Sequence, residues 1–496
     1  MTLNELIRSM QIVQKVNYSD MPVRTVTDDS RDVQPGAVFV AVDGEEVDGH
    51  GFVREAMDRG AAAIICERLP VDEPTCPVLQ VKNSRQALSH VAASFYGRPA
   101  DRMRCIGVTG TDGKTTTTEL IHAILEEDQR SSGCLTTVRS EVGGQERDSS
   151  QTTPHPLDMH RMLREMADEG QSHACMEVSS HALVHRRTAH VPFDTAVLTN
   201  VTQDHLDFYG SLENYIGAKE ILFNELDSES VAVLNAECPH WWRYSNATPA
   251  NVLTYGRRSL ADVRLVDNRN TIRGTRLTVR TPLDKFTVFS PLVGDYNCEN
   301  VLAAVTAAFG MGIPAESIIR AIENFEGVGG RLEKIAAPSW SDLPTVFVDY
   351  AHTPNALEKV LRNLQPLTQG RLICVFGCGG DRDRDKRPKM GNAVTEIADL
   401  AVITADNSRS ERTEDIIEEI VAGVDQDGAS YHAEPDRRRA IEYALRASDS
   451  PEDVVAVCGR GCEQFQQLGE RKIPFDDRVV IREMMDRAAG EQKRSA

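Results

Sequence analysis

The chain alternates short apolar runs with amphipathic segments along most of its length. Near the N-terminus, runs of β-branched and small apolar residues at 38–42 and 61–67 enclose a segment, 52–61, with the apolar spacing of a helix. Runs of the same kind return at 104–110, 194–200 and 230–235. Strands that alternate with helices predict an α/β fold, in which mostly parallel strands gather their loops at the carboxyl edge of a sheet.

The same pattern begins again beyond residue 331. The predicted strands there are 345–351, 371–379, 400–406 and 453–461, and the predicted helices include 354–364, 413–424 and 437–447. A chain of 496 residues is too long for one hydrophobic core. We therefore predict three α/β domains: a small N-terminal domain at 1–102, a central parallel sheet at 103–331, and an open, Rossmann-like sheet at 332–496.

The stretch GVTGTDGKTTTT, residues 107–118, carries the clearest chemical signal. It follows a predicted strand and precedes a predicted helix, which is the setting of a phosphate-binding loop. Backbone N–H groups at the helix N-terminus can face an anion, Lys114 can neutralise phosphate oxygens, and Thr115 can hold Mg²⁺. The residues predicted to bind the nucleotide are Gly110, Thr111, Asp112, Gly113, Lys114, Thr115 and Thr116. A GTPase is disfavoured, because the N-K-x-D guanine-reading motif is missing from the sequence.

Composition narrows the choice of partners. The net charge of −20 argues against broad nucleic-acid binding, since clustered Lys and Arg are needed to hold a phosphate backbone. The eleven cysteines are scattered and form no C-x-x-C pair, which favours a reducing, cytoplasmic environment over a disulfide framework. The longest mostly apolar stretch, 301–313, is too short to span a bilayer. We expect a cytoplasmic protein with small-molecule partners, no nucleic acid and no membrane.

The loop sequence Thr109 to Thr115, T-G-T-D-G-K-T, resembles the ATP loop of the Mur ligase family, the ATP-dependent amide-forming enzymes of peptidoglycan precursor synthesis. Residues 28–61, DDSRDVQPGAVFVAVDGEEVDGHGFVREAMDRGA, resemble the UDP-binding domain of its MurE type, the third amino-acid-adding ligase. Further motifs follow in the order of the family over roughly residues 25 to 480. The resemblance implies ATP and Mg²⁺ as cofactors, UDP-N-acetylmuramoyl-L-alanyl-D-glutamate as substrate, a P-loop ATPase-type central domain, and a monomer.

Site residues follow from this resemblance, position by position. It implies that Ser30, Thr152, Thr153, Ser179, His185 and Arg187 contact the UDP-linked substrate, with His185 standing where relatives often carry Gln. It implies nucleotide contacts from Asn297, Arg331 and Asp349. The implied catalytic residues are Lys114, Glu177, His205 and Lys219, and the implied Mg²⁺ ligands are Thr115, Glu177, His205 and Lys219, the last as a carbamate. From the residues alone, Glu177 ends an apolar strand, and a hard cation suits one carboxylate, one imidazole and phosphate oxygens.

The last motifs concern the incoming amino acid. Residues 375–391, VFGCGGDRDRDKRPKMG, resemble the MurE signature. The resemblance places Arg382 at the position that binds the incoming amino acid. DNSR stands where diaminopimelate-adding relatives have D-N-P-R, and GRGCE where they have G-K-G-H-E; the implied contacts are Asp406, Asn407, Ser408, Arg409, Gly459 and Glu463. A guanidinium at 409 suits the distal carboxylate of meso-2,6-diaminopimelate and would repel the ammonium end of lysine. The motifs therefore favour diaminopimelate.

Three other functions are compatible with part of the sequence. A lysine-adding ligase of the same type is the nearest alternative, and Arg409 argues against it. A folylpolyglutamate synthetase would keep the ATP loop, but it has no need for the motif around Ser30 or for DNSR. A non-catalytic nucleotide-binding regulator would be expected to have lost a phosphate or metal residue, and Lys114 and Glu177 are both present.

Overall fold

The computed structural model of the chain describes residues 1–44, 47–71, 73–149, 151–258, 260–336, 343–425 and 430–495. These residues form two compact units. The first contains residues 1–266, 279–286 and 299–321, and the second contains residues 267–278, 287–298 and 322–496. The predicted alternation of strands and helices is present in both units, so the α/β fold class is confirmed.

A five-stranded sheet lies at the N-terminal end of the first unit, in the order β1-β5-β4-β3-β2. Its strands are β1 (Gln14–Val16), β2 (Thr25–Thr27), β3 (Ala37–Val40), β4 (Ala63–Cys66) and β5 (Val78–Gln80). All pair in parallel except β1 with β5. Side chains alternate along β3, so that α1 (Leu3–Leu6) and α3 (Ser84–Phe95) cover one face and α2 (Val53–Asp58) the other. Short 3₁₀ turns lie at η1 (Ser30–Asp32), η2 (Gly49–Phe52) and η3 (Pro99–Arg102).

The large sheet has eleven strands in the order β16-β15-β14-β13-β12-β11-β6-β10-β7-β8-β9. They are β6 (Arg104–Thr109), β7 (Ser132–Leu135), β8 (Arg139–Val142), β9 (Gln145–Asp148), β10 (His173–Glu177), β11 (Phe193–Leu198), β12 (Val231–Asn235), β13 (Asn251–Gly256), β14 (Val263–Thr271), β15 (Gly274–Arg280) and β16 (Lys285–Ser290). Neighbouring strands along the run β13-β12-β11-β6-β10-β7 pair in parallel, whereas β7–β8 and β8–β9 are antiparallel. The predicted parallel sheet is thus extended by meander strands at its edge.

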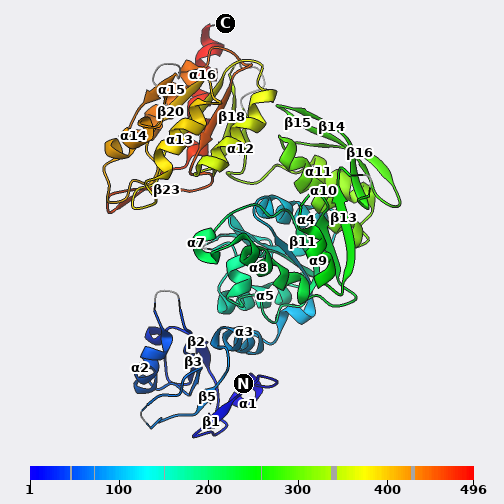
Figure 1. The fold of residues 1–496 in the computed structure, drawn as a ribbon, viewed down its shortest axis with the longest axis vertical. Helices are drawn as coiled ribbons and strands as arrows, with labels where there is room; N and C mark the ends of the chain where they lie inside the picture. The colour runs from blue at the N-terminus through cyan, green and yellow to red at the C-terminus, as the bar shows by residue number, and fades with distance from the viewer. Residues whose placement is uncertain are drawn as a thin grey trace. The chain divides into compact units, whose positions relative to one another are not determined.

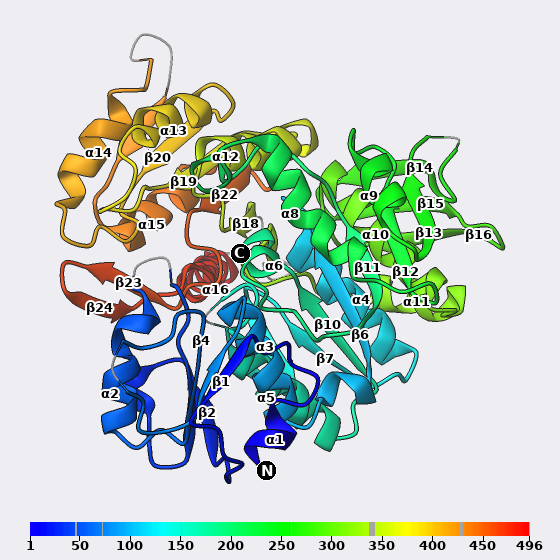
Figure 2. The ribbon, with the colours of Figure 1, turned by 60° about the horizontal axis from the view of Figure 1, so that its bottom comes forward.

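Helices follow most strands of this sheet. They are α4 (Lys114–Glu127), α5 (Pro156–Asp168), α6 (Ser180–Val184), α7 (Leu206–Tyr209), α8 (Leu212–Asn224), α9 (Trp241–Ala247), α10 (Asp295–Gly310) and α11 (Ala315–Glu323). One hydrophobic cluster joins α5, α8 and α9 to Cys105 of β6 and to alternate residues of β10 and β11. Helix α4 lies against β6, β10 and β7 (Figure 2). The loop 110–113 connects the central strand β6 directly to α4.

The second unit is built on a six-stranded sheet in the order β17-β18-β22-β19-β20-β21. Its strands are β17 (Glu333–Ile335), β18 (Thr345–Asp349), β19 (Leu372–Phe376), β20 (Leu400–Ile403), β21 (Tyr431–Ala433) and β22 (Val454–Cys458), and only β17 is antiparallel to its neighbour. Helices α12 (Pro354–Leu364), α13 (Lys386–Thr395) and α14 (Thr413–Val421) cover one face, and α15 (Arg437–Ala447) and α16 (Asp477–Ser495) cover the other (Figure 1). A hairpin of β23 (Phe465–Leu468) and β24 (Arg471–Pro474) and a 3₁₀ turn η4 (Gln365–Leu367) complete the unit.

A fully buried ion pair joins the two helices of the second face. The guanidinium of Arg437 donates to both carboxylate oxygens of Asp477 at 2.8 and 2.7 Å, and neither side chain is exposed. Asp477→Asn would leave the buried cation uncompensated, so we expect the free energy of unfolding to fall by about 3–5 kcal/mol. Urea denaturation followed by circular dichroism measures this. Glu483→Gln on α16 breaks the exposed pair with Arg438 and serves as control; equal losses in both variants would contradict the prediction.

Candidate functional site

The register of the large sheet brings three strand ends together. Val108 in β6 pairs with Glu177 in β10, and Thr109 pairs with Leu198 in β11. Because the three strands are parallel neighbours, the residues that follow them meet at one edge. The glycine loop, Glu177 and the segment Thr199–Asn200 therefore share this edge of the sheet.

Two glycines of the loop are required by its backbone. Gly110 has φ of +153°, and a Cβ there would lie 1.8 Å from Oγ1 of Thr199. Gly113 has φ of +82° and is the residue immediately before helix α4. Lys114 then turns its Nζ back over the loop, where it donates to the carbonyls of Gly110 (3.2 Å) and Thr111 (2.8 Å). The predicted loop thus has the geometry of an anion site at a helix N-terminus.

Sequence reasoning missed Thr199 and Asn200, which help to hold this loop. Asn200 accepts from the N–H of Thr111 through its carbonyl (2.9 Å) and from the N–H of Asp112 through its side chain (3.0 Å). The Thr199 hydroxyl donates to the carbonyl of Asp112 at 2.6 Å. In the sequence, Thr199 and Asn200 are the polar residues that end the apolar run 194–200. Their position points to the loop only once β11 is known to pair with β6.

Behind the loop, Thr115 and Glu177 form a buried pair. The Thr115 hydroxyl donates to Oε1 of Glu177 at 2.9 Å, and both side chains are buried, as is Thr116. A hydroxyl that donates its hydrogen to a carboxylate keeps its oxygen lone pairs for another partner. This arrangement fits the predicted sharing of a hard cation between Thr115 and Glu177.

Lys219 is the most unusual basic residue of the site. Only 1% of it is exposed, its Nζ donates to the carbonyl of Gly110 at 2.8 Å, and it lies 4.3 Å from the centre of the Tyr215 ring. Burial, and then the charge of Lys114, hold the pKa of Lys219 well below its ordinary value. A depressed pKa favours the neutral amine, which is the form of lysine that combines with CO₂ to give a carbamate.

A cavity of about 400 Å³ opens beside Lys114 and Lys219, and Thr115 and Glu177 lie behind its lining residues. Nine of the predicted site residues line it: Gly110, Thr111, Lys114, Thr152, Thr153, Ser179, Arg187, His205 and Lys219. Five lining residues were not predicted: Gln151, Ser180, His181, Asp204 and Tyr215. The structure therefore brings part of the predicted phosphate loop and four of the six predicted substrate residues to one cavity, whereas Asp112, Gly113, Thr115, Thr116 and Glu177 do not line it.

Hydrogen bonds tie the substrate side of the cavity to Glu177. The Thr153 hydroxyl donates to the carbonyl of Glu177 at 2.8 Å and accepts from the N–H of Ser179 at 3.0 Å. Arg187 donates to the carbonyl of Thr153 (3.1 Å) and to the side chain of Gln151 (2.8 Å). Gln151 could have been found as the polar residue that precedes the Thr-Thr pair.

Two residues predicted to contact the UDP-linked substrate do not line this cavity. His185 ends helix α6, and its ring nitrogen pairs with Arg85 of α3. Ser30 opens the turn η1 and donates to Glu55 at 3.3 Å. Their contact with a substrate stays a prediction.

The donor set fits a cation that is shared with phosphate. Within the described ranges, no group of three His, Cys, Asp or Glu side chains comes close enough to hold a metal ion alone. His205 is half exposed at the cavity, with its ring centre 4.9 Å from that of His181. One carboxylate, one imidazole and a carbamate at Lys219 would leave coordination positions to phosphate oxygens, as Mg²⁺ sites commonly do.

The other predicted nucleotide residues belong to the second unit. The carboxylate of Asp349 is buried, accepts from the N–H groups of Leu332 and Ala351 at 2.7 Å each, and has its pKa raised by burial. The guanidinium of Arg331 lies 5.0 Å from the Tyr350 ring centre, and Asn297 donates to the carbonyl of Val293 at 2.9 Å. Their role toward the nucleotide stays a prediction.

The residues predicted for the amino acid form one connected group in the second unit. A Cβ on Gly379 would lie 3.1 Å from Nη1 of Arg409 and 3.9 Å from Cγ of Arg382, so both arginines border that glycine. Gly459, with φ of +116°, would place a Cβ 2.7 Å from Oδ2 of Asp406. That oxygen is buried and accepts no hydrogen bond from the described residues. A carboxylate oxygen that has no protein donor in the described ranges, next to a glycine without a side chain, can accept a hydrogen bond from an ammonium group.

Asn407 and Glu463 complete this group. The Asn407 side chain donates to Oε2 of Glu463 at 2.9 Å and accepts from Arg460 (3.0 Å) and from the N–H of Gln467 (2.7 Å). The buried Arg460, one of the substitutions relative to G-K-G-H-E, therefore fixes the orientation of the Asn407 amide. Ser408, in place of proline, accepts from the Thr413 hydroxyl at 3.1 Å, which supplies a local restraint on the loop.

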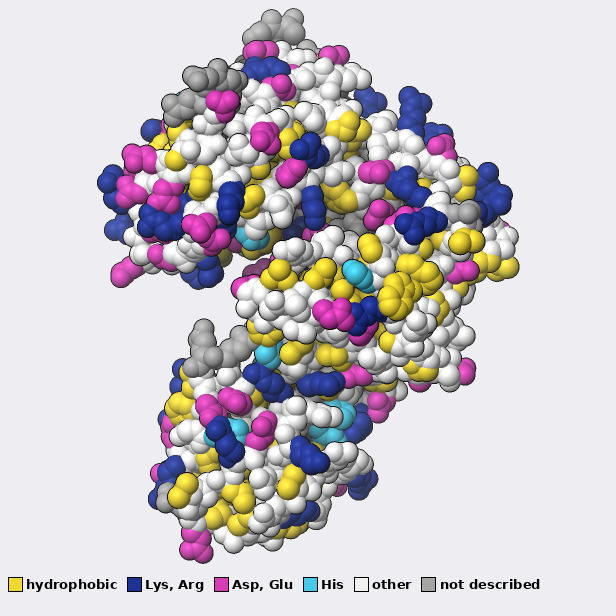
Figure 3. Space-filling view, in the orientation of Figure 1, with side chains coloured by type: hydrophobic (Ala, Val, Ile, Leu, Met, Phe, Trp, Pro, Cys, Tyr) yellow, Lys and Arg dark blue, Asp and Glu magenta, His cyan; other side chains and the backbone are white. Residues whose placement is uncertain are grey.

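On the face shown in Figure 3, acidic and basic side chains are interspersed instead of forming one basic field. In the part of the chain that the structure describes, no helix combines the length and apolar character needed to cross a bilayer. All eleven cysteines are free thiols.

A parallel sheet whose central strand ends in a Gly-Lys-Thr loop, beside a buried carboxylate, defines an α/β protein of the P-loop nucleotide-binding class. Residues 22–96 match the family model "Mur ligase family, catalytic domain", residues 108–308 "Mur ligase middle domain", and residues 330–461 "Mur ligase, glutamate ligase domain". The chain belongs to the Mur ligase family, which confirms the resemblance seen in its motifs.

Relatives of this chain carry specific names. It is 42% identical, over 98% of both chains, to the UDP-N-acetylmuramoyl-L-alanyl-D-glutamate--2,6-diaminopimelate ligase of Gloeobacter violaceus. A solved structure of a ligase with the same name is 31% identical, with a TM-score of 0.70 over 94% of this chain and 95% of that one. The MurF ligase of Thermotoga maritima in complex with ADP shares the fold, at 21% identity and a TM-score of 0.63 over 95% and 99% of the two chains.

Proposed function

We propose that this chain is the ATP-dependent ligase that joins meso-2,6-diaminopimelate to UDP-N-acetylmuramoyl-L-alanyl-D-glutamate during synthesis of peptidoglycan precursors. The observation that carries the proposal is that one cavity is lined by Lys114, Lys219 and His205 together with Thr153 and Arg187. A phosphate loop that faces the predicted substrate residues suits the transfer of a phosphoryl group onto that substrate. The names of the relatives supply the identity of the two substrates.

We further propose domain boundaries at 1–102, 103–331 and 332–496, because each of the three large sheets falls within one of these ranges. The UDP-linked substrate would belong to the first and second ranges, ATP to the second, and the amino acid to the third. A cytoplasmic location fits the eleven free thiols and the dependence on ATP. We propose that the enzyme works as a monomer.

In the first chemical step, a carboxylate oxygen of the D-Glu residue attacks the γ-phosphorus of ATP. The bond from that phosphorus to the β-bridging oxygen breaks, so an acyl phosphate and ADP form. Lys114, at the N-terminus of α4, neutralises charge on the transferred group, and Arg187 and Thr153 orient the attacking carboxylate. Thr115, Glu177, His205 and carbamylated Lys219 would hold Mg²⁺, which supplies charge neutralisation for the phosphates.

In the second step, the neutral amine of diaminopimelate attacks the acyl carbon. The tetrahedral intermediate loses inorganic phosphate, and the amine gives up its proton, so one amide bond replaces one acyl phosphate. Asp406 and Glu463 are suited to ammonium groups of the amino acid, and Arg382 and Arg409 to its carboxylates. Domain closure would exclude water, which otherwise hydrolyses the acyl phosphate.

Phosphate release from ATP tests the proposal directly. The purified chain is given UDP-N-acetylmuramoyl-L-alanyl-D-glutamate, ATP and Mg²⁺, with meso-diaminopimelate, L-lysine or no amino acid, and the product is weighed by mass spectrometry. We expect release that depends on diaminopimelate and a product heavier by one diaminopimelate less water. Phosphate release with L-lysine alone would support ligase activity but contradict the proposed specificity for diaminopimelate. No phosphate release with either amino acid would favour a nucleotide-binding regulator.

A further inference from the structure

The turn between β7 and β8 places Thr137 against Glu177. The backbone N–H and the hydroxyl of Thr137 both donate to Oε2 of Glu177, the hydroxyl at 2.8 Å. The other carboxylate oxygen, Oε1, accepts from Thr115. Glu177 is therefore held from two sides, by the helix that follows the glycine loop and by this turn.

The same hydroxyl reaches the substrate side of the cavity. Oγ1 of Thr137 lies 3.0 Å from Oγ1 of Thr152, which lines the cavity. One side chain thus touches a proposed metal ligand and a proposed substrate contact, although Thr137 itself is not among the lining residues. A shift of this turn would move the partners of both groups together.

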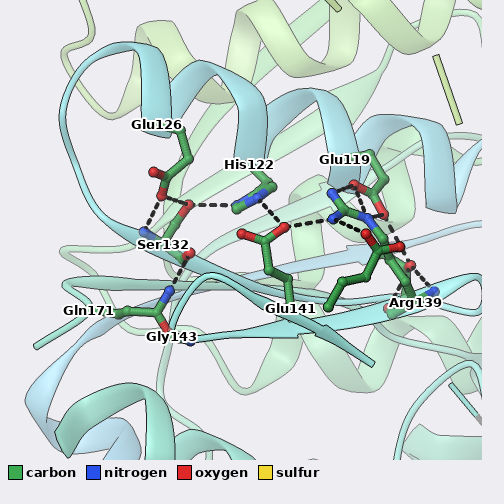
Figure 4. A network of polar contacts seen from close by, with 10 residues as sticks. Glu119, His122, Glu126, Ser132, Arg139, Glu141, Gly143 and Gln171 are labelled. Carbon is green, nitrogen blue, oxygen red and sulfur yellow. Dashed lines mark hydrogen bonds and ion pairs between the residues drawn. The ribbon is translucent and has the colours of Figure 1, made fainter. Parts of the chain in front are cut away.

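The turn is tied to helix α4 by a two-point ion pair, which Figure 4 shows from close by. Arg139 donates from Nε to Oε1 of Glu119 at 3.0 Å and from Nη2 to Oε2 at 2.6 Å. The Thr136 hydroxyl oxygen lies 3.2 Å from Oε1 of the same Glu119 and 3.0 Å from the carbonyl oxygen of Arg139, so its one hydrogen can be donated to either acceptor. Glu119 lies on the helix that begins with Lys114 and Thr115, so this pair fixes the turn relative to the phosphate loop.

A second carboxylate extends the network away from the site. Arg139 also donates to Glu141 at 2.6 Å, and Glu141 lies 3.3 Å from His122 of α4 (Figure 4). The hydrogen bond from His122 and the charge of Arg139 lower the pKa of Glu141 to about 2. Two charged contacts, Arg139 with Glu119 and Glu141 with His122, therefore hold the start of β8, and with it the turn before it, against α4.

We propose that Thr137 is a positioning residue of the ligase reaction: it fixes the plane of the Glu177 carboxylate, and the Arg139–Glu119 pair fixes Thr137. The inference rests on the proposed function through the role of Glu177 toward Mg²⁺. Each oxygen of a carboxylate has two lone pairs, so one can accept a hydrogen bond while the other faces a cation. Without the hydroxyl, only the backbone N–H would hold Oε2, and the carboxylate could rotate away.

The test compares Thr137→Val, which keeps the shape but removes the hydroxyl, with Thr137→Ser, which keeps the hydroxyl. Ser140→Ala is the matched control, because its buried hydroxyl on β8 makes no hydrogen bond to the described residues. Two quantities are measured: the Mg²⁺ concentration that gives half-maximal phosphate release, and the affinity for ADP by calorimetry with and without Mg²⁺. The second quantity does not depend on turnover.

For Thr137→Val we expect about a tenfold rise in half-saturating Mg²⁺, the loss of one hydrogen bond to a charged group. The gain in ADP affinity caused by Mg²⁺ should shrink by a similar factor, with ADP affinity in the absence of Mg²⁺ unchanged. Thr137→Ser and Ser140→Ala should behave as the unaltered chain. Normal Mg²⁺ dependence in Thr137→Val, or an equal shift in Ser140→Ala, would overturn the inference.

Arg139→Met tests the ion pair. It should reproduce part of the Mg²⁺ shift of Thr137→Val; a lower melting temperature with unchanged Mg²⁺ dependence would remove the ion pair from the inference.

Glu177→Gln separates this inference from the proposed function. If Glu177→Gln keeps normal turnover and Mg²⁺ dependence, the role proposed for Glu177 fails; if it is inactive while Thr137→Val is normal, only the positioning role fails.

Discussion

Replacing Lys114 by Met is expected to reduce diaminopimelate-dependent phosphate release by about 10²–10³-fold in kcat. The Lys114 ammonium lies over the loop, within hydrogen-bond distance of the carbonyls of Gly110 and Thr111. A bound γ-phosphate offers that ammonium oxygens of higher charge, and the charge on the transferred group must be neutralised as it moves from ATP to the substrate carboxylate. The loss therefore falls mainly on kcat, because the interaction is strongest in the transition state.

Stopped assays with saturating substrates measure this effect, and circular dichroism confirms that the variant folds. Lys285→Met, which removes an exposed lysine on β16, is the control and should leave kcat unchanged. Lys114→Arg should recover little, because a planar guanidinium cannot take the place of a compact ammonium within the tight loop. A Lys114→Met enzyme with near-normal kcat would remove the assignment of residues 110–116 as the ATP loop.

The glycine loop could be predicted because its signal is local. Gly110 and Gly113 are needed for left-handed backbone, and Lys114 and Thr115 follow at once on the helix that the pattern predicts. Glu177 could be singled out from the sequence, since a carboxylate at the end of an apolar run is uncommon in a buried strand, and its role toward Mg²⁺ stays a prediction. The fold class followed in the same way from the alternation of strands and helices.

The residues that hold these groups could not be predicted. Asn200 meets the loop only because β11 pairs with β6, and Thr137 meets Glu177 only because β7 pairs with β10. Strand order and register are set by packing between distant segments, which one sequence without relatives does not reveal. The meander strands β8 and β9 were missed as well, because short, polar edge strands lack a clear apolar pattern.

Arg460 shows how a departure from a family pattern can be detected from the sequence before its role is known. The substitution in GRGCE was visible, but its consequence depends on burial: the side chain is fully buried and donates to Asn407 and to the carbonyl of Phe465 at 2.6 Å. The guanidinium thereby connects the end of β22 to the hairpin β23–β24 and to the DNSR loop. A lysine has one ammonium and could not make the same planar set of contacts.

Arg409→Met is expected to lower kcat/KM for diaminopimelate by about 10–100-fold, with the KM for ATP unchanged. Arg409 has φ of +48°, its N–H donates to the carbonyl of Gln467, and its guanidinium donates to the carbonyl of Gly380, so the side chain is directed along the Gly379–Gly380 backbone. Met and Lys at 409 would bear the same left-handed backbone cost as Arg, which leaves the side-chain chemistry as the difference between the variants. Arg409→Lys keeps the charge without the two-point fork and should lose less. Arg412→Met, which removes an exposed guanidinium three residues on, is the control.

Competition assays with diaminopimelate and L-lysine then measure the ratio of the two kcat/KM values. That ratio should fall at least as far as kcat/KM for diaminopimelate does, because the repulsion of the lysine ammonium is removed together with the attraction for the distal carboxylate. An unchanged ratio would place the discrimination between the two amino acids outside Arg409.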